Sequence, residues 1–391
     1  MEKVRYGIVG IGNMGKSHMN WLFNGDVPNA ELTAVCDINP ERLEFARGVC
    51  GDKVAYYDDY HEMIKSGLVD AVLIATPHYL HPVIGIEAFE HGLHVMSEKP
   101  IGVYTKQAEE FIAAAEKSGK AFGAMFCLRT EKTYQKMREM VQSGLLGELK
   151  RCIWIITTWY RTQSYYNSGG WRATWAGEGG GVLMNQCPHT LDLWQWIFGM
   201  PCEVYANCEF GKYHDIEVED EVNAMVKYSN GATGMFITTT GENPGTNRLE
   251  ITGSKGKLVL QDGKITYTKL EIDERQFTMG TTEGFGKIPT STEIVKVDEE
   301  KPSMHVGILK NFTNHILFGE ELLAPGVEGI NALSLANAML LSTWKGGWIK
   351  LPMDGDEYWN YLSEKIKTSK AKETDANVVM DLSGSFSGGS K

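Results

Sequence analysis

The sequence lacks several features that mark whole classes of protein. Its 391 residues contain no apolar run approaching the length of a membrane span, and the net charge of −12 argues against nucleic acid or an anionic membrane surface as a partner. The seven cysteines include no Cys-x-x-Cys pair, which favours reduced thiols. An expected strand begins by Val4 and leaves no room for a signal peptide. We therefore expect a cytoplasmic protein.

The patterns that are present predict two domains, since a chain of this length exceeds one ordinary core. Short apolar runs alternate with helical stretches through residues 1–126, which predicts an α/β Rossmann domain built on a doubly wound parallel sheet. Hairpin signals at Ser229-Asn230-Gly231 and Gln261-Asp262-Gly263 predict an α+β domain in residues 127–391, with a large, open and mostly antiparallel sheet. Its polar end, after about residue 366, is expected to be mobile.

Individual elements follow from the same patterns. In the first domain we expect strands at residues 4–9, 31–36, 68–75, 94–97 and 121–126. Asn39 and Pro40 are typical of a helix start, as cap and first-turn proline. In the second domain, residues 151–161 are predicted to form one long strand, and alternation would send Arg161 and Tyr160 to opposite faces. Late helices are expected at residues 306–318 and 327–345.

A glycine-rich turn after the first strand indicates a dinucleotide site. Gly10, Gly12 and Gly15 have the G-x-G-x-x-G spacing, and Asp37 ends the second strand 22 residues later. The glycines allow a tight turn against the pyrophosphate, and a carboxylate at this spacing reaches the adenosine ribose hydroxyls. Because Asp37 would repel a 2′-phosphate, NAD is favoured over NADP as the cofactor. The other predicted contacts of this half of the cofactor are Asn13, Met14 and Ile38.

Two further segments follow strand ends, where ligands bind in open α/β sheets. They are Thr76-Pro77-His78-Tyr79-Leu80-His81 and Glu98-Lys99-Pro100. His81 could lie near the nicotinamide ribose or could serve only to cap the helix that starts near Pro82. The spacing of the histidines at positions 78, 81, 91 and 94 matches no metal site, and no metal is expected. From these segments we expect cofactor contacts by Thr76, His78, His81, Glu98 and Lys99.

A third motif lies in the second domain, where Gly179-Gly180-Gly181 opens a helical stretch. Asn185 and His189 are four residues apart, so they should share one helical face, although Pro188 makes that face approximate. A single histidine there is most often a satisfied core residue. Combined with a dinucleotide turn and Lys99 at a strand end, it indicates a hydride-transfer enzyme.

Jointly, these motifs resemble the Gfo/Idh/MocA family, named for glucose–fructose oxidoreductase and inositol dehydrogenase, over about residues 3–350. The resemblance implies that Lys99 and His189 are catalytic, with Asn185 as a third member where many relatives have aspartate. An amide at this position adds no negative charge to hold Lys99 protonated. The segments that resemble a branch with levoglucosan dehydrogenase and glycoside 3-dehydrogenases are Trp159-Tyr160-Arg161, Trp171-Arg172 and Glu178 to Gln186.

The activity implied is NAD-dependent oxidation, or the reverse reduction, of a ring secondary alcohol of a sugar, a glycoside (at C3) or a cyclitol. His189 would take the hydroxyl proton and Lys99 would stabilise the developing alkoxide, with a rate that rises with pH through the neutral range. Trp171 and Arg172 are expected at the cofactor or the rim of the site. The expected substrate contacts are Lys99, Arg129, Tyr160, Arg161, Asn185 and His189.

Two other functions fit the same motifs. One is an NAD-dependent glycosidase, in which transient oxidation permits elimination and readdition. The other is a non-catalytic NAD-sensing regulator, which retention of Lys99 and His189 disfavours. The family's open sheet often forms the subunit interface, and an uncovered sheet face would expose an apolar patch, so a homodimer or homotetramer is expected.

Overall fold

The computed structural model describes residues 2–298 and 303–370. Its first domain holds six parallel strands in the order β3-β2-β1-β4-β5-β6. The strands are β1 Val4–Val9, β2 Ala30–Cys36, β3 Ala55–Tyr57, β4 Ala71–Ile74, β5 His94–Ser97 and β6 Phe122–Ala124. The helices between them are α1 Asn13–Phe23, α2 Pro40–Cys50, α3 Tyr60–Lys65, α4 Leu80–Glu90 and α5 Thr105–Ser118, with the short 3₁₀ turn η1 Gly51–Lys53 after α2.

This sheet confirms the predicted doubly wound arrangement. Every residue of β4 is buried, as expected of a central strand covered by helices on both faces. The Asn39 side chain accepts a hydrogen bond from the backbone N–H of Glu41, and Pro40 opens α2, so this helix begins as its cap predicts. The predicted strand at residues 68–75 is shorter in the structure, where pairing begins at Ala71.

The second domain is built on nine strands in the order β14-β13-β12-β11-β7-β10-β9-β8-β15. Only β7 and β10 pair in parallel, so the expected mostly antiparallel sheet is confirmed. Its strands are β7 Leu149–Ile156, β8 Glu203–Phe210, β9 Glu219–Lys227, β10 Thr233–Thr239, β11 Asn247–Gly253, β12 Gly256–Gln261, β13 Lys264–Leu270, β14 Thr290–Ile294 and β15 Ile349–Lys350. Both predicted hairpins are present, between β9 and β10 and between β12 and β13.

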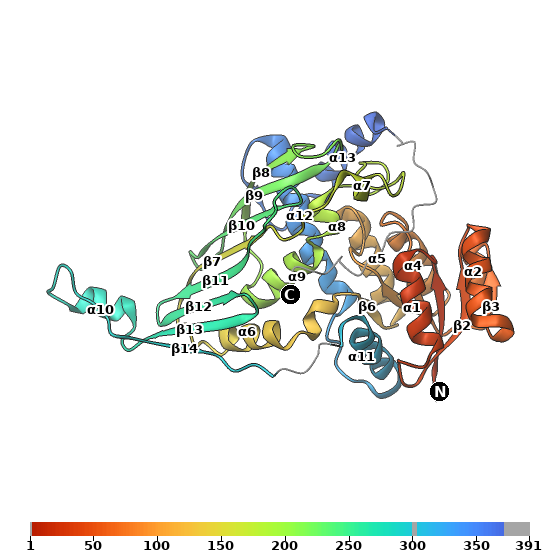
Figure 1. Cartoon of the computed structure of the whole chain (residues 1–391), viewed down its shortest axis with the longest axis horizontal. Helices are drawn as coiled ribbons and strands as arrows, with labels where there is room; N and C mark the ends of the chain where they lie inside the picture. Colours follow the sequence, from red (N-terminus) through yellow and green to blue (C-terminus); the bar gives the residue numbers. More distant parts are fainter. Residues whose placement is uncertain (1, 299–302, 371–391) are drawn as a thin grey trace.

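The helical segments of this domain pack beside and beyond the sheet. They are η2 Cys127–Thr130, α6 Lys132–Gln142, α7 Gln163–Tyr166, α8 Val182–Asn185, α9 Pro188–Phe198, α10 Glu274–Gly280, α11 Met304–Phe318, η3 Gly326–Glu328, α12 Gly329–Lys345 and α13 Gly355–Thr368. Figure 1 shows α6, α9 and α12 between the large sheet and the first domain, and α10 on an arm that projects away from both. In the described parts of the chain, no helix has the length and apolarity needed to cross a membrane.

One expectation about this domain needs revision. Strand β7 ends at Ile156, where its pairing with β10 and β11 ends, and the next backbone N–H, that of Thr157, bonds to Thr246 just before β11. The predicted alternation of Tyr160 and Arg161 therefore does not apply. Helix α13 ends at Thr368, and residues 371–391 lie outside the described residues, so the expectation of a mobile end stays a prediction.

The two domains are joined by more than one crossing of the chain. Helix α11 follows β14 of the large sheet in sequence yet packs against β1, where the hydroxyls of Tyr6 and Thr313 lie 2.8 Å apart. Asn337 of α12 donates to the carbonyl of Val103 and accepts from the N–H of Thr105. The domain boundary at 126/127 remains a prediction, because C-terminal helices complete the cover of the first domain.

Candidate active site

The glycine turn leaves the N-terminus of α1 open. A Cβ on Gly15 would lie 1.8 Å from the carbonyl oxygen of Gly10, and Gly10 has a φ of +93°, so the protein's own packing requires both glycines. A Cβ on Gly12 would meet no atom within 4 Å, and Gly12 caps α1 with no side-chain hydrogen bond. These features fit a dinucleotide, because its pyrophosphate would approach the backbone at Gly12 and face the N–H groups of Asn13 and Met14.

Asp37 is fixed at the edge of this turn. Its carboxylate is 4% exposed and accepts the backbone N–H of Ile11 at 2.7 Å and that of Asn39 at 2.9 Å. Ile38, next to it, is 88% exposed. The guanidinium of Arg42 lies 3.3 Å from the Asp37 carboxylate and offsets part of its charge. This arrangement places a carboxylate and an apolar surface where the adenosine half of a dinucleotide would bind.

The segment after β4 contributes a buried hydroxyl and two histidines. Within the described residues, Oγ1 of Thr76 is buried without a hydrogen-bond partner, which also fits a polar ligand at this strand end. The ring nitrogens of His81 lie 2.8 Å from the carbonyl oxygens of Thr76 and Pro100, so His81 ties two strand-end loops together. His78 is buried against Trp171, and burial lowers its pKa well below the usual value.

Glu98 turns toward α1. Its Oε1 lies 2.7 Å from Nε2 of His18, and both side chains are almost fully buried. Burial raises the pKa of Glu98, but the hydrogen bond and charge of His18 outweigh that effect and bring the pKa to about 2. Glu98 is therefore ionised, and its other oxygen accepts the backbone N–H of Lys99 at 3.2 Å.

We had expected Asn185 and His189 to share one helical face, but the structure places them in two different helices. Asn185 ends α8 and His189 lies in the first turn of α9, which begins at Pro188. The break brings the backbone of Asn185, rather than its amide, to Lys99: Nζ donates to the Asn185 carbonyl oxygen at 2.8 Å. Burial lowers the pKa of Lys99, and the charges of Glu98 and Glu178 offset part of that effect.

His189 is 3% exposed and packs edge-on against Phe126. Burial, followed by the positive charge of Lys99, lowers the pKa of His189 well below its usual value. The imidazole is therefore neutral at physiological pH, which is the state that a general base requires. A rate increase governed by His189 should accordingly fall on the acid side of neutrality, not through the neutral range.

The sequence analysis gave no role to Glu178, which the structure places beside Asn185. The Asn185 amide donates to Oε1 of Glu178, which is 1% exposed. Asn185 Oδ1 also accepts from the hydroxyl of Tyr165 at 3.3 Å. The guanidinium of Arg172 lies 4.6 Å from the ring centres of both Tyr165 and Trp171 and 3.8 Å from Glu178. The position of Glu178 before the three glycines was a signal, but nothing in the sequence marks it as buried.

The three glycines permit close packing of α8 on β9. A Cβ on Gly181 would lie 2.0 Å from the carbonyl oxygen of Glu219, and one on Gly179 would lie 2.1 Å from Val103. The Glu219 carboxylate accepts the N–H groups of Gly181 and Leu183, which fixes the start of α8. Burial raises the pKa of Glu219 to about 7. The glycine run thus sets where Asn185 and His189 meet Lys99.

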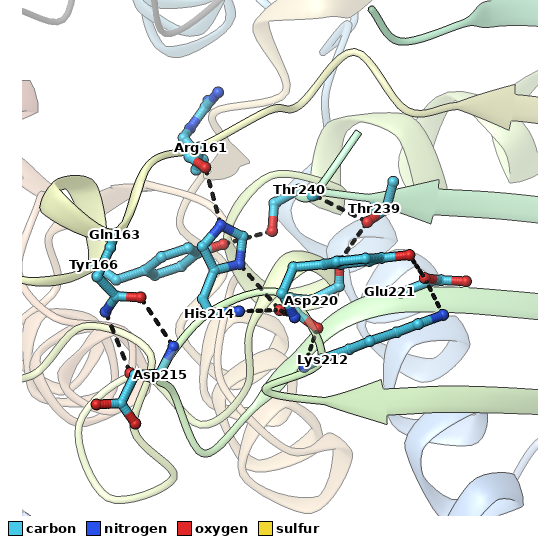
Figure 2. Close-up of polar contacts among 12 residues, drawn as sticks. Arg161, Gln163, Tyr166, Lys212, His214, Asp215, Asp220, Glu221, Thr239 and Thr240 are labelled. Atoms are coloured by element: carbon cyan, nitrogen blue, oxygen red, sulfur yellow. Dashed lines mark hydrogen bonds and ion pairs between the residues drawn. The ribbon is translucent and has the colours of Figure 1, made fainter. Parts of the chain in front are cut away.

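The segment carrying Arg161 is held by His214, whose side chain is 6% exposed, as Figure 2 shows. Tyr160 is 46% exposed, and the carbonyl oxygen of Arg161 lies 2.9 Å from Nε2 of His214. Asp220, which is fully buried, lies 3.0 Å from Nδ1 of the same ring and accepts the N–H groups of residues 212–214. The two ring nitrogens of His214 thus connect the Asp220 carboxylate to the backbone of Arg161.

Arg129 lies away from the surface, 1% exposed. Its guanidinium donates to both carboxylate oxygens of Asp192, to Glu328 and to the carbonyl oxygen of Leu323. These bonds assign Arg129 to holding η2 against α9 and η3, so we do not include it among the substrate contacts proposed below.

Comparisons with known proteins bear on this geometry. Residues 4–126 match the oxidoreductase family with an NAD-binding Rossmann fold, and residues 134–259 match the GFO/IDH/MocA C-terminal domain. Myo-inositol 2-dehydrogenase of Thermotoga maritima is 24% identical over 89% of this chain and 98% of its own length. D-glucoside 3-dehydrogenase of Escherichia coli is 25% identical over 89% of this chain and 97% of its own length.

A solved structure is similar throughout. The WlbA dehydrogenase of Bordetella pertussis, in complex with NADH and UDP-GlcNAcA, has a TM-score of 0.74 and 28% identity over 90% of this chain and all of that chain. The matches cover both domains, including the glycine turn, Lys99 and His189. The chain therefore belongs to the Gfo/Idh/MocA family of oxidoreductases, with NAD as its cofactor.

Proposed function

We propose that this protein oxidises a ring secondary alcohol of a sugar, glycoside or cyclitol, and that on a glycoside the reacting carbon is C3. Bound NAD would accept the hydride from that carbon. The products are a ring ketone, NADH and a proton, and the reverse reaction uses the same groups. The observation that carries the proposal is the Lys99 ammonium bound to the Asn185 carbonyl after β5, with a neutral His189 near enough for the charge of Lys99 to lower its pKa.

The side chains divide the chemistry between them. His189 accepts the hydroxyl proton, which its lowered pKa permits at physiological pH. Lys99 donates a hydrogen bond to the oxygen as negative charge develops there, and its own position is set by the carbonyl of Asn185. The proposed substrate contacts also include Tyr160, Arg161 and Trp171, whose partly exposed rings and guanidinium suit the C–H faces and hydroxyls of a pyranose.

The proposed substrate class is supported by relatives that act on inositol and on D-glucosides and that match nearly their full length to this chain. Purified protein with NAD should be screened against pyranosides and inositols, with absorbance of NADH as the readout. Net NADH formation, with a 3-keto product identified by NMR, is the expected result. Glycoside cleavage without NADH accumulation would favour the glycosidase instead, and NAD binding without turnover on the whole panel would favour the regulator.

We further propose that two-fold assembly uses the outer face of the large sheet. Cross-strand pairing aligns Tyr205, Met225 and Met235 in one row, with exposures of 38%, 45% and 39%. Trp348, 40% exposed, lies beside Tyr205. Such a row on a soluble enzyme is typical of an interface. Light scattering at micromolar concentration should give a dimer or tetramer, and Met225→Lys with Met235→Lys should lower that mass; a monomeric native protein would contradict the proposal.

A further inference from the structure

Asn185 links Lys99 to a buried carboxylate. Its carbonyl oxygen accepts the Lys99 ammonium at 2.8 Å, and its amide donates to Glu178. We propose that Glu178 is a positioning residue for Lys99, supplying through Asn185 the negative charge that holds the ammonium at the substrate's oxygen. The inference rests on the proposed function, in which Lys99 donates to that oxygen. It also gives the Asn185 side chain a definite task, which is to fix the carboxylate in place.

The charge balance around Lys99 leaves few candidates for this role. Burial lowers the pKa of the neighbouring imidazoles and so disfavours their charged forms: His78, His81, His189 and His305. Burial raises the pKa of the thiols of Cys127 and Cys187, so these are neutral. Arg172 adds a second cation. Among the described residues that act on Lys99, the carboxylates are Glu98 and Glu178.

The two carboxylates have different partners. Glu98 shares its charge with His18 at 2.7 Å and meets Lys99 through the lysine's backbone N–H. Glu178 contacts the residue that binds the Lys99 ammonium itself. Burial raises the pKa of Glu178, whereas the charge of Arg172, the N–H of Ala173, the Asn185 amide and Lys99 all favour its ionised form. The ammonium and this carboxylate therefore stabilise each other's charge.

A direct test measures the titration of Lys99 in the full-length protein without cofactor or substrate. Acetic anhydride labels only the neutral amine, so the pH dependence of Lys99 labelling, followed by peptide mass spectrometry, reports its pKa. Glu178→Gln removes the charge but keeps an oxygen for the Asn185 amide. We expect the midpoint of Lys99 labelling to move about 1 pH unit lower, the size of effect expected when an opposite charge nearby is lost.

The matched control is Glu217→Gln, the same substitution at a carboxylate that binds the backbone at Trp175, three residues before Glu178. Glu217 accepts from the N–H of Trp175 and the hydroxyl of Ser369 and has no contact with Lys99 or Asn185 among the hydrogen bonds of the described residues. This variant should leave the Lys99 midpoint unchanged. An equal shift in both variants, or no shift with Glu178→Gln, would overturn the proposal.

A charge exchange provides the second variant. Glu178→Gln combined with Asn185→Asp moves the carboxylate onto the residue that binds Lys99 and the amide onto its neighbour. Its midpoint should return to within about 0.3 pH unit of the native value, a small part of the opposite-charge effect. Because it keeps one carboxylate and one amide, it also tests the proposal if Glu178→Gln alone does not fold. If the Lys99 midpoint of this double variant lay about one pH unit below the native value, the proposed electrostatic role of Glu178 would be overturned.

Turnover adds a separate readout once a substrate is identified. The alkaline limb of kcat/KM should move lower in Glu178→Gln and return in the double variant, while the acid limb set by His189 stays in place. If the dehydrogenase proposal fails, no such limb exists, yet the labelling shift would still be present. If the labelling midpoint does not move while turnover is normal, only the role of Glu178 fails.

Discussion

The glycine turn with Asp37 and the second domain differ in how far along the chain their functional residues find their partners. In the first domain Asp37 bonds to residues 2 and 26 positions away, within one β-α-β unit. In the second domain His214 reaches Arg161 across 53 positions, and Arg129 reaches Asp192 and Glu328 across 63 and 199. The cofactor half is thus specified by a short pattern, whereas the substrate half depends on how distant segments pack.

The largest effect is expected at His189, where catalysis should be lost without loss of cofactor binding. His189→Ala should lower kcat by about 10²–10⁴-fold, the usual contribution of a positioned acid–base group, and leave the glycine turn intact. NAD binding, followed by fluorescence titration, should be unchanged. In the native enzyme the rise of kcat with pH should occur below pH 7, because the pKa of His189 is lowered. Loss of NAD binding with near-normal turnover would show that His189 belongs to the cofactor half.

The long-range contacts can be broken at Arg129. Arg129→Met leaves the fully buried Asp192 without its charge partner and should lower the free energy of unfolding by about 3–5 kcal/mol. Arg129→Met with Asp192→Leu should recover much of that loss, since no buried charge remains unpaired. Urea unfolding measures the free energy of unfolding of the single and the double variant. A single variant as stable as the native protein would show that this pair is not needed to join η2 to α9.

The local pattern is tested at Asp37. The native protein should prefer NAD to NADP, and Asp37→Ala should narrow that preference about tenfold by removing a hydrogen bond to the ribose and a repulsive charge. Arg42→Ala removes the facing cation without the carboxylate and should widen the preference. The ratio of kcat/KM for the two cofactors is the measurement, with circular dichroism as a check because Asp37 also binds Ile11 and Asn39. Better native turnover with NADP would refute the assignment.

The smallest effect is expected at His214. His214→Gln keeps one donor, so the variant loses about one hydrogen bond of the pair that joins Asp220 to the Arg161 carbonyl. KM for the sugar should rise about two- to tenfold, as for the loss of a bond of about 0.5–1.5 kcal/mol, with kcat and NAD affinity little changed. Steady-state kinetics measures KM and kcat separately. A fall in kcat without a change in KM would mean that the Arg161 segment does not contact substrate.

The sequence alone was sufficient for the cofactor half. The glycine spacing and Asp37 predicted β1, α1 and β2 with the turn between them, because these residues meet neighbours in the same supersecondary unit. The parallel, doubly wound character of the first sheet was predicted from strand–helix alternation, whereas β3 and the order of the strands were not. Lys99 was noted for its place after a strand and His189 for its combination with the dinucleotide turn and Lys99, and their catalytic roles remain predictions.

The tertiary structure alone decided how these residues meet. The break between α8 and α9 turns the carbonyl of Asn185 to Lys99 and its amide to Glu178, although their spacing suggested one helix. The buried partners of Arg129 and His214 come from segments whose patterns say nothing of one another. Burial and long-range charge set the pKa of His189, and both depend on packing between distant parts of the chain.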